Sequence, residues 1–327
     1  MRTSLLAAAG LAALAVTTLA PAAPAWADWA PTKPVEFVVM AGPGGGADKI
    51  ARFIAGLAQK HNLFPVEAKV VNMPAHSGSD ALSHLKNNSG NDHLLIFTLN
   101  SFFTVPLIRP DLGIDIVSFT PIARLGLDPF LLWVHMDRTD INSISDFEIA
   151  VEKADNWTMA GTGSMQEDEL LTILLNSFLT SKKMKYQAQG GGGDVARLLA
   201  ERKVQSTVNN PGEIHAYHMA RRVKPLAAFT KDRLPQYADT PTFWELGLEI
   251  EYLMQRGVAG MSGDAAQYYS AVFEKVFKLP EWQKYREGSG LVGDFLTGAP
   301  LREYWRAQLE LHGRMLEVAR ALRKDGR

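Results

Sequence analysis

VEFVVMAGPGGGAD, at residues 35–48, decides the fold of this chain. It joins an apolar run at residues 35–40, through a glycine-rich turn, to a helical pattern that starts at Asp48. Glycine allows the sharp turn and the close approach of a ligand to the backbone. Because the N–H groups at a helix N-terminus lack partners within the helix, a strand, a glycine turn and a helix in this order can bind an anion. We therefore predict that an anionic group binds to the backbone of Gly44, Gly45, Gly46 and Ala47.

Strand-like and helix-like segments alternate along the rest of the chain. The expected strands are 35–40, 66–71, 94–99, 122–127, 130–134, 157–160, 185–187, 205–209 and 225–229. The expected helices are 48–60, 79–86, 143–154, 165–179, 194–202, 242–246, 265–278, 281–288 and 301–324, so that the part after residue 230 is mainly helical. Such alternation indicates an α/β fold with mostly parallel sheets.

The N-terminal segment has the features of an export signal. Arg2 precedes an apolar core at residues 5–19, and Ala25-Trp26-Ala27 fits an A-x-A cleavage site. We expect residues 1–27 to be removed and the mature protein to start at Asp28. The chain has no cysteine, which excludes disulfides, thiol catalysis, thiolate metal sites and a lipid anchor on an N-terminal cysteine. These features predict a periplasmic protein of a Gram-negative bacterium.

The size and charge of the remaining 300 residues narrow the class of protein. A chain of this length is large for one core, and we predict two lobes connected near residues 124–128 and 229–231. Residues 28–126 and 230–327 would form one lobe, and residues 127–229 the other. With 33 basic and 35 acidic side chains the mature chain carries a net charge of −2, which disfavours a nucleic-acid partner. No later segment has 18 uninterrupted apolar residues, so we expect no membrane span.

Three further strand-to-helix junctions are small and polar. In parallel α/β sheets such junctions gather at the carboxyl ends of the strands, where ligands bind. We therefore predict one cleft between the lobes, lined by the glycine turn and by Asn100, Ser101, Thr162, Gly163, Ser164, Gly191, Gly192 and Asp194. Few basic side chains lie in these loops, so backbone N–H groups, hydroxyls, amides and water would bind the anion without an arginine clamp. A single glycine turn before a helix is more often an ordinary turn, and Ser164 is also compatible with a simple helix cap.

Four motifs in order resemble one known family. They are Trp29-Ala30-Pro31-Thr32-Lys33-Pro34-Val35 before the first strand, Gly44-Gly45-Gly46-Ala47-Asp48 with Ala51-Arg52, Tyr186 with Gly190-Gly191-Gly192 and Leu198-Leu199, and Asp239-Thr240-Pro241-Thr242-Phe243-Trp244-Glu245-Leu246-Gly247. Along nearly the whole mature chain the sequence resembles the periplasmic solute-binding proteins of tripartite tricarboxylate transporters, the Bug family. Other family motifs depart: Asn72-Met73-Pro74-Ala75-His76-Ser77-Gly78 stands where N-x-P-G-A-x-G is usual.

The resemblance implies a type II periplasmic-binding fold that closes over an organic carboxylate. One ligand carboxylate would lie against the first glycine loop, and the loop at Thr162, Gly163 and Ser164 would face it from the other lobe. Asn100 and Ser101 would add side-chain contacts, and the loop from Gly191 to Asp194 would close the distal end. The implied protein is a monomer and not an enzyme. It needs no cofactor and delivers its ligand to membrane transporter subunits.

Three other functions compete with transport. Residues 42–47 fit G-x-G-x-x-A, and Glu67 lies about where a ribose-binding acid of a dinucleotide-dependent oxidoreductase would stand. His215 and His218, with Glu213 nearby, have the spacing of one helical face but lack a third-ligand pattern for a metal. A periplasmic sensor for a signalling receptor would have the same ligand-binding body as a transport protein.

Overall fold

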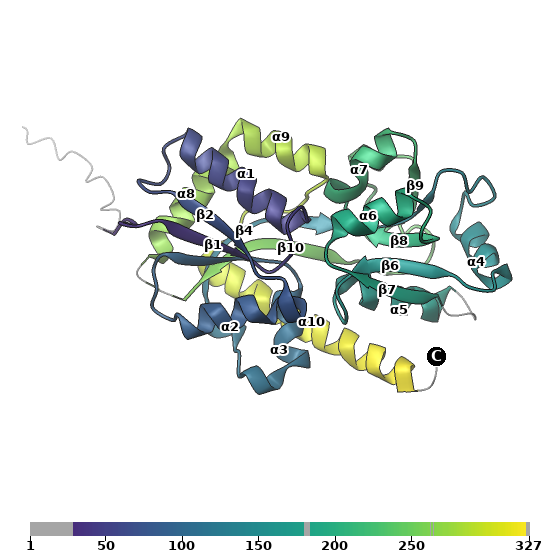
Figure 1. Cartoon of the computed structure of the whole chain (residues 1–327), viewed down its shortest axis with the longest axis horizontal. Coiled ribbons are helices and arrows are strands. Elements are labelled where there is room, and N and C mark those ends of the chain that lie inside the picture. The colour runs from purple at the N-terminus through teal and green to yellow at the C-terminus, as the bar shows by residue number, and fades with distance from the viewer. Residues whose placement is uncertain (1–28, 180–183, 262, 264, 325–327) are drawn as a thin grey trace, which may run out of the picture.

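Two five-stranded sheets form the centres of two lobes that lie side by side (Figure 1). The computed structural model describes residues 29–179, 184–261, 263 and 265–324. The predicted export signal lies outside the described residues. Both lobes have helices against their sheets, so the predicted two-lobe α/β fold is confirmed.

The first sheet has the order β2-β1-β3-β10-β4. Its strands are β1 (Val35–Val39), β2 (Ala68–Asn72), β3 (Leu94–Thr98), β4 (Thr120–Pro129) and β10 (Leu253–Gly260). The first three are parallel, and β10 runs antiparallel between β3 and β4. In Figure 1, α1 (Gly46–Lys60), α8 (Ala266–Lys278) and α9 (Pro280–Ser289) lie above this sheet, and α2 (Ser79–Asn87), α3 (Ser101–Ile108) and α10 (Gly298–Lys324) lie below it.

The second sheet has the order β7-β6-β8-β5-β9. Its strands are β5 (Leu131–His135), β6 (Thr158–Thr162), β7 (Lys185–Gln189), β8 (Ser206–Asn209) and β9 (Val223–Ala228). The helices α6 (Gly192–Ala200) and α7 (Pro211–Met219) lie on one side, α5 (Glu167–Phe178) lies on the other, and α4 (Ile144–Lys153) is at the far end (Figure 1). Short 3-10 turns occur at Ala75–Gly78, Pro110–Leu112, Ile116–Ser118 and Pro235–Tyr237.

The chain passes between the sheets twice. Phe130 lies between β4 and β5, so the two expected strands around Asp128 belong to different lobes. The return runs from the end of β9 to the start of β10. Although we expected the first lobe to resume at residue 230, Thr242 forms a β-bridge with Ala228, which adds this part of the return to the second sheet. The first sheet resumes only at Leu253.

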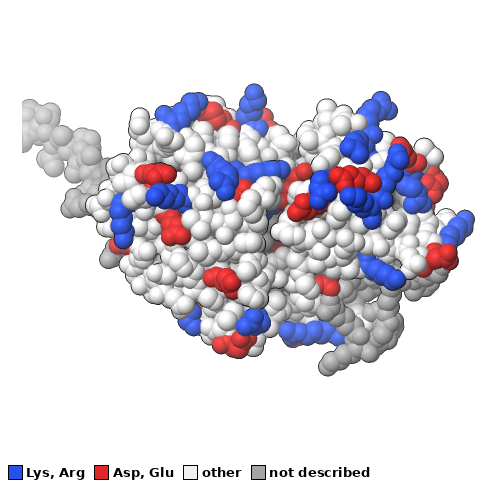
Figure 2. All heavy atoms as spheres, in the orientation of Figure 1, with Lys and Arg blue, Asp and Glu red and all other residues white. Residues whose placement is uncertain are grey.

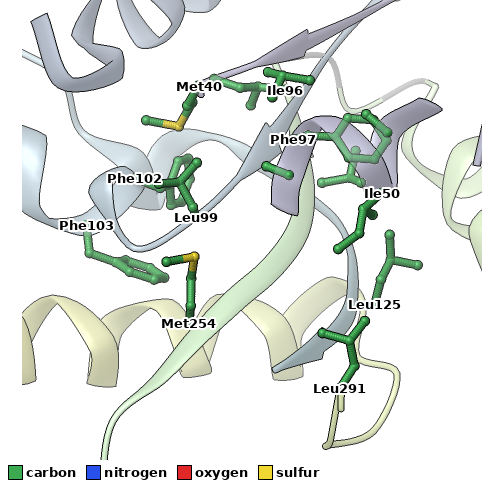
Figure 3. Close-up of a cluster of buried hydrophobic side chains, with 14 of the residues drawn as sticks. Met40, Ile50, Ile96, Phe97, Leu99, Phe102, Phe103, Leu125, Met254 and Leu291 are labelled. Atoms are coloured by element: carbon green, nitrogen blue, oxygen red, sulfur yellow. The ribbon is translucent and has the colours of Figure 1, made fainter. Parts of the chain in front are cut away.

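Aromatic and aliphatic side chains fill the first lobe against β10 and α10. In Figure 3 Leu99, Phe102 and Phe103 lie near Met254 of β10, and all four are buried. An apolar stripe on α10 packs against this core. Trp305 packs edge-on to Phe102 at 5.0 Å between ring centroids, and its neighbours on the stripe are largely buried.

Local sequence signals place most elements, and the exceptions have physical causes. Ser143 caps α4, accepting the N–H of Asp146 at 3.1 Å. The strand β10 was missed because Gln255 and Arg256 interrupt its apolar pattern, yet both side chains are buried. Thr242 forms the β-bridge and residues 243–247 form turns, in place of the expected helix. The helix α3 was also missed, since it contains Pro106.

Charged side chains of both signs are interspersed over the face shown in Figure 2. No basic face of the kind that binds nucleic acid is seen there. Within the described residues, no helix has both the length and the apolar character required to cross a membrane.

Candidate ligand-binding cleft

Residues of both lobes enclose a small cavity where the two sheets meet. It is lined by Ala41, Gly45, Gly46, Ala47, Leu99, Thr162, Glu167, Asp168, Gly191, Gly192, Asn210, Glu213, Met254 and Arg256. All four predicted junctions contribute to this lining. The cavity volume of about 30 Å³ accommodates one or two water molecules. An organic ligand can therefore enter only when a lining side chain moves or the lobes separate.

The first glycine loop already binds carboxylates of the protein itself. The N–H of Gly44, whose φ of +81° favours glycine, donates to Asp48 Oδ2 at 2.8 Å. Arg52 pairs with the same carboxylate at 2.9 Å. The N–H of Gly46 donates at 2.7 Å to Oε1 of Glu213, which comes from α7 of the second lobe. The predicted anion cradle therefore holds a carboxylate in this structure, supplied from across the cleft.

Two glycines make room for the charged side chains of Glu213 and Arg256. A Cβ on Gly192 would overlap Oε2 of Glu213. Position 192 in the second glycine loop therefore accepts only glycine while Glu213 stays in place. A Cβ on Gly46 would overlap the guanidinium of Arg256. Lys49 Nζ donates to the carbonyl of Gly212, at the start of α7, at 3.1 Å. Together these contacts hold the two lobes close at the glycine loops.

Arg256 is the one cation among the described lining residues, and it comes from a strand and not from the predicted loops. It lies on β10, is 4% exposed, and donates from Nε to Asp128 Oδ2 at 2.8 Å. A second, weaker contact joins it to Asn210 of the second lobe at 3.4 Å. Burial raises the pKa of Asp128 to about 6, although Arg256 opposes that shift. Burial lowers the pKa of Arg256, but the charges of Asp128 and Glu213 outweigh it and raise the value overall.

Glu167 and Asp168, in the first turn of α5, add two buried carboxyl groups to the cavity wall. Burial raises the pKa of Glu167, while the backbone N–H groups of Ser101 and Asn100 oppose that rise. Burial raises the pKa of Asp168 well above its usual value, and the charges of Glu167 and Glu213 raise it further. Among the described residues, Oε1 of Glu167 has no hydrogen-bond partner.

In the predicted second-lobe loop at Thr162, Gly163 and Ser164, and at Met165 directly after it, several polar groups bond within the protein. Thr162 donates to Asp168 Oδ2 at 2.7 Å, and Gly163 to the carbonyl of Gln189 at 2.9 Å. The N–H of Met165 and the hydroxyl of Ser164 both donate to Glu169. Thr162 lines the cavity, while the N–H groups of Thr162, Gly163 and Met165 already donate to acceptors of the protein itself.

The other predicted contact residues are placed differently. The amide of Asn100 is 0% exposed and bonds to β10 in both directions, donating to Leu253 O at 3.0 Å and accepting from Gln255 N at 2.9 Å. Ser101 is buried beside it at the start of α3, and the cavity wall there is Leu99. Asp194 forms an ion pair with Arg197 on the surface of α6, with 3.2 Å between Oδ1 and Nη2.

The alternative sites lack the required geometry. Val35 pairs with Ala68, so Glu67 lies beside the start of β1, about 16 Å of strand away from the glycine turn at its end. His215 bonds to the hydroxyl of Tyr237 at 3.0 Å, and His218 bonds to a backbone carbonyl. The carboxylate of Glu213 accepts a hydrogen bond from the Gly46 N–H and does not complete a metal site with these histidines. No group of three potential metal ligands occurs among the described residues.

The four charged lining residues all escaped sequence reasoning: Glu167, Asp168, Glu213 and Arg256. The first two directly follow a predicted loop, so their place at a helix start was a usable signal. Glu213 also stands in the first turn of a helix that Pro211 opens, but its contact with Gly46 depends on how the lobes meet. Arg256 offered no signal without knowledge of β10.

Comparisons with known proteins show the class of fold. No protein-family profile matches the chain, and neither does any curated protein sequence. Solved structures match over most of its length. A protein of R. palustris with adipate is 21% identical with a TM-score of 0.80, covering 89% of this chain and 98% of that one. The periplasmic binding protein BugD is 19% identical with a TM-score of 0.79, covering 88% and 98%.

A TctC solute-binding protein from Polaromonas, without ligand, is 21% identical with a TM-score of 0.63, covering 88% of this chain and 99% of that one. The chain thus has the two-lobe α/β fold of periplasmic binding proteins. The likeness to TctC and BugD confirms the resemblance that the sequence motifs indicated.

Proposed function

We propose that this protein is a periplasmic solute-binding protein. It captures an organic carboxylate between its lobes and delivers it to a tripartite tricarboxylate-type membrane transporter. The observation that supports the proposal is the bond from the Gly46 N–H to Glu213 Oε1, because it places a carboxylate oxygen on the predicted cradle. A ligand carboxylate would replace Glu213 there.

Binding in this proposal favours the closed form. The glycine loop belongs to the first lobe, and Thr162 and Gly192 belong to the second, so only the closed protein offers both sets of contacts. Each hydrogen bond to a charged group nets about 1.5–3 kcal/mol, and micromolar affinity needs about 8 kcal/mol. Four such bonds are sufficient, and no group that performs covalent chemistry is required. A membrane partner would then distinguish the closed form from the open one.

The proposal is tested by Gly45→Asp in the protein from residue 28 onward. A Cβ at Gly45 meets Gly42 O at 3.4 Å and Glu213 Oε1 at 3.8 Å, so the side chain fits and places a negative charge beside the cradle. Gly56→Asp is the matched control, since a Cβ there meets nothing within 4 Å on the same helix. A thermal-shift screen of aliphatic and aromatic carboxylates first identifies a ligand. We expect Gly45→Asp to abolish its binding and Gly56→Asp to preserve it; equal affinity in both folded variants would refute the site.

A sensor of the same ligand is the second candidate, since the binding body would be identical. Neighbouring genes separate the two roles. A gene for this protein beside genes for transporter membrane subunits supports transport, and ligand uptake that persists after its deletion counts against it.

A further inference from the structure

The cavity in the cleft has an excess of carboxyl groups. Glu167, Asp168 and Glu213 line it, and Arg256 is the one cation among its described lining residues. Arg256 already pairs with Asp128 behind it, through Nε and Nη2. The hydrogen bonds that Glu213 and Asp168 accept come from backbone N–H groups and not from cations.

Glu167 gives a second observation that points to a ligand. Glu167 is 1% exposed, and its Oε1 has no hydrogen-bond partner among the described residues. A buried acceptor without a donor costs free energy, and native proteins rarely keep one without a role. Because Glu167 lines the cavity, a donor bound in the cavity lies next to its carboxyl group.

We infer that the ligand carries a protonated amine as well as a carboxylate, and that the amine binds to Glu167 and Asp168. The statement that the ligand carries a carboxylate rests on the proposed function above. An ammonium group has three donors and no acceptor, which suits an unpaired carboxylate oxygen. Burial disfavours the charged forms of both carboxyl groups as long as no cation is near, and an ammonium group supplies that cation, whereas a second carboxylate would add another negative charge. The cleft therefore disfavours dicarboxylates through charge repulsion. It favours aminocarboxylates, whichever carbon carries the amine.

The experiment compares ligands that share a carbon chain and differ only at their polar groups. Titration calorimetry on the protein from residue 28 onward uses hexanoate, 2-aminohexanoate, 6-aminohexanoate, adipate and 1,6-diaminohexane, and then the four-carbon equivalents. We expect one aminocarboxylate to bind about tenfold or more tightly than the plain monocarboxylate, the ratio that one charge-assisted hydrogen bond provides. The dicarboxylate is expected to bind more weakly than the aminocarboxylate.

Each outcome bears on a different statement. A dicarboxylate that binds as tightly as the best aminocarboxylate overturns this inference and leaves the proposed carboxylate function standing. If no compound with a carboxylate binds, the proposed function fails, and the inference fails with it.

A variant tests the assigned residue. Glu167→Gln removes the charge and keeps the shape, so the preference for the aminocarboxylate over the monocarboxylate should disappear while monocarboxylate binding persists. Glu201→Gln is the control, because it changes the net charge equally at an exposed position on the same lobe. Where Glu167→Gln does not fold, Asp168→Asn is measured in its place. A folded variant of this pair that keeps the full preference overturns the inference.

Discussion

Replacing Glu213 by alanine is expected to strengthen the binding of a carboxylate in this cleft. Glu213 Oε1 accepts the Gly46 N–H at 2.7 Å, and its carboxylate fills the space beside Gly192. A ligand that uses the same N–H must first displace this group. Removing the competitor returns the free energy of one charge-assisted hydrogen bond, about 1.5–3 kcal/mol, which corresponds to about a 10- to 150-fold gain in affinity.

The assay is titration calorimetry with the tightest carboxylate found in the thermal-shift screen. Glu201→Ala is the matched control, since it removes the same charge from an exposed turn and should leave the affinity unchanged. Small-angle scattering without ligand provides a second readout. The alanine variant loses the contact between α7 and the glycine loop, so its radius of gyration should rise.

An unchanged or reduced affinity in a folded Glu213→Ala variant would contradict the reasoning. It would mean that the carboxylate of Glu213 is part of the ligand site and not a competitor for it. A gain seen equally in Glu201→Ala would indicate a general charge effect on the ligand and would also refute the specific contact.

Three further predictions concern stability. Asp128→Asn leaves the buried Arg256 without its carboxylate and should lower the free energy of unfolding in urea by about 3–5 kcal/mol. Burial lowers the pKa of His312 from 6.5 to about 4, so this group stabilises the fold fully above pH 6.5 and the contribution is lost as the pH falls through 4. It amounts to roughly 3 kcal/mol, and His312→Gln should reduce the difference in unfolding free energy between pH 7 and pH 4 by that amount; an identical difference in both proteins excludes it. Ser143→Ala removes the cap on Asp146 N and should cost about 1 kcal/mol by the same urea measurement, whereas no change would show that water replaces the cap.

The fold could be predicted because its signals are local. The apolar run before Gly44, the helix face after it and the serine cap at residue 143 each depend on a few neighbouring residues. The strand β10 lacked such a signal. Gln255 is buried there because its side chain bonds to Thr98 and Trp305, which lie far away in the sequence.

The site could be predicted only in part, for the same reason. The glycine loops can be recognised as turns from the sequence. The predicted residues that line the cavity are Gly45, Gly46, Ala47, Thr162, Gly191 and Gly192. Glu213 resembles any acidic residue in the first turn of a helix, where the helix dipole favours a negative charge. That it crosses to the other lobe follows from packing between distant segments, which no short motif encodes.

The helix α10 has a consequence for how solvent and ligand reach the cleft. Its first half is anchored in the first lobe by Leu301 and Trp305, and its second half reaches the other lobe, where Leu316 and Ala319 cluster with Leu170 of α5. Over 27 residues it extends about 40 Å beneath both sheets, on the side away from α1 and α7 (Figure 1). The two lobes are thus fastened along one side of the molecule. Separation costs an apolar contact there and only polar contacts at the glycine loops, which favours a one-sided opening and a single entrance between α1 and α7.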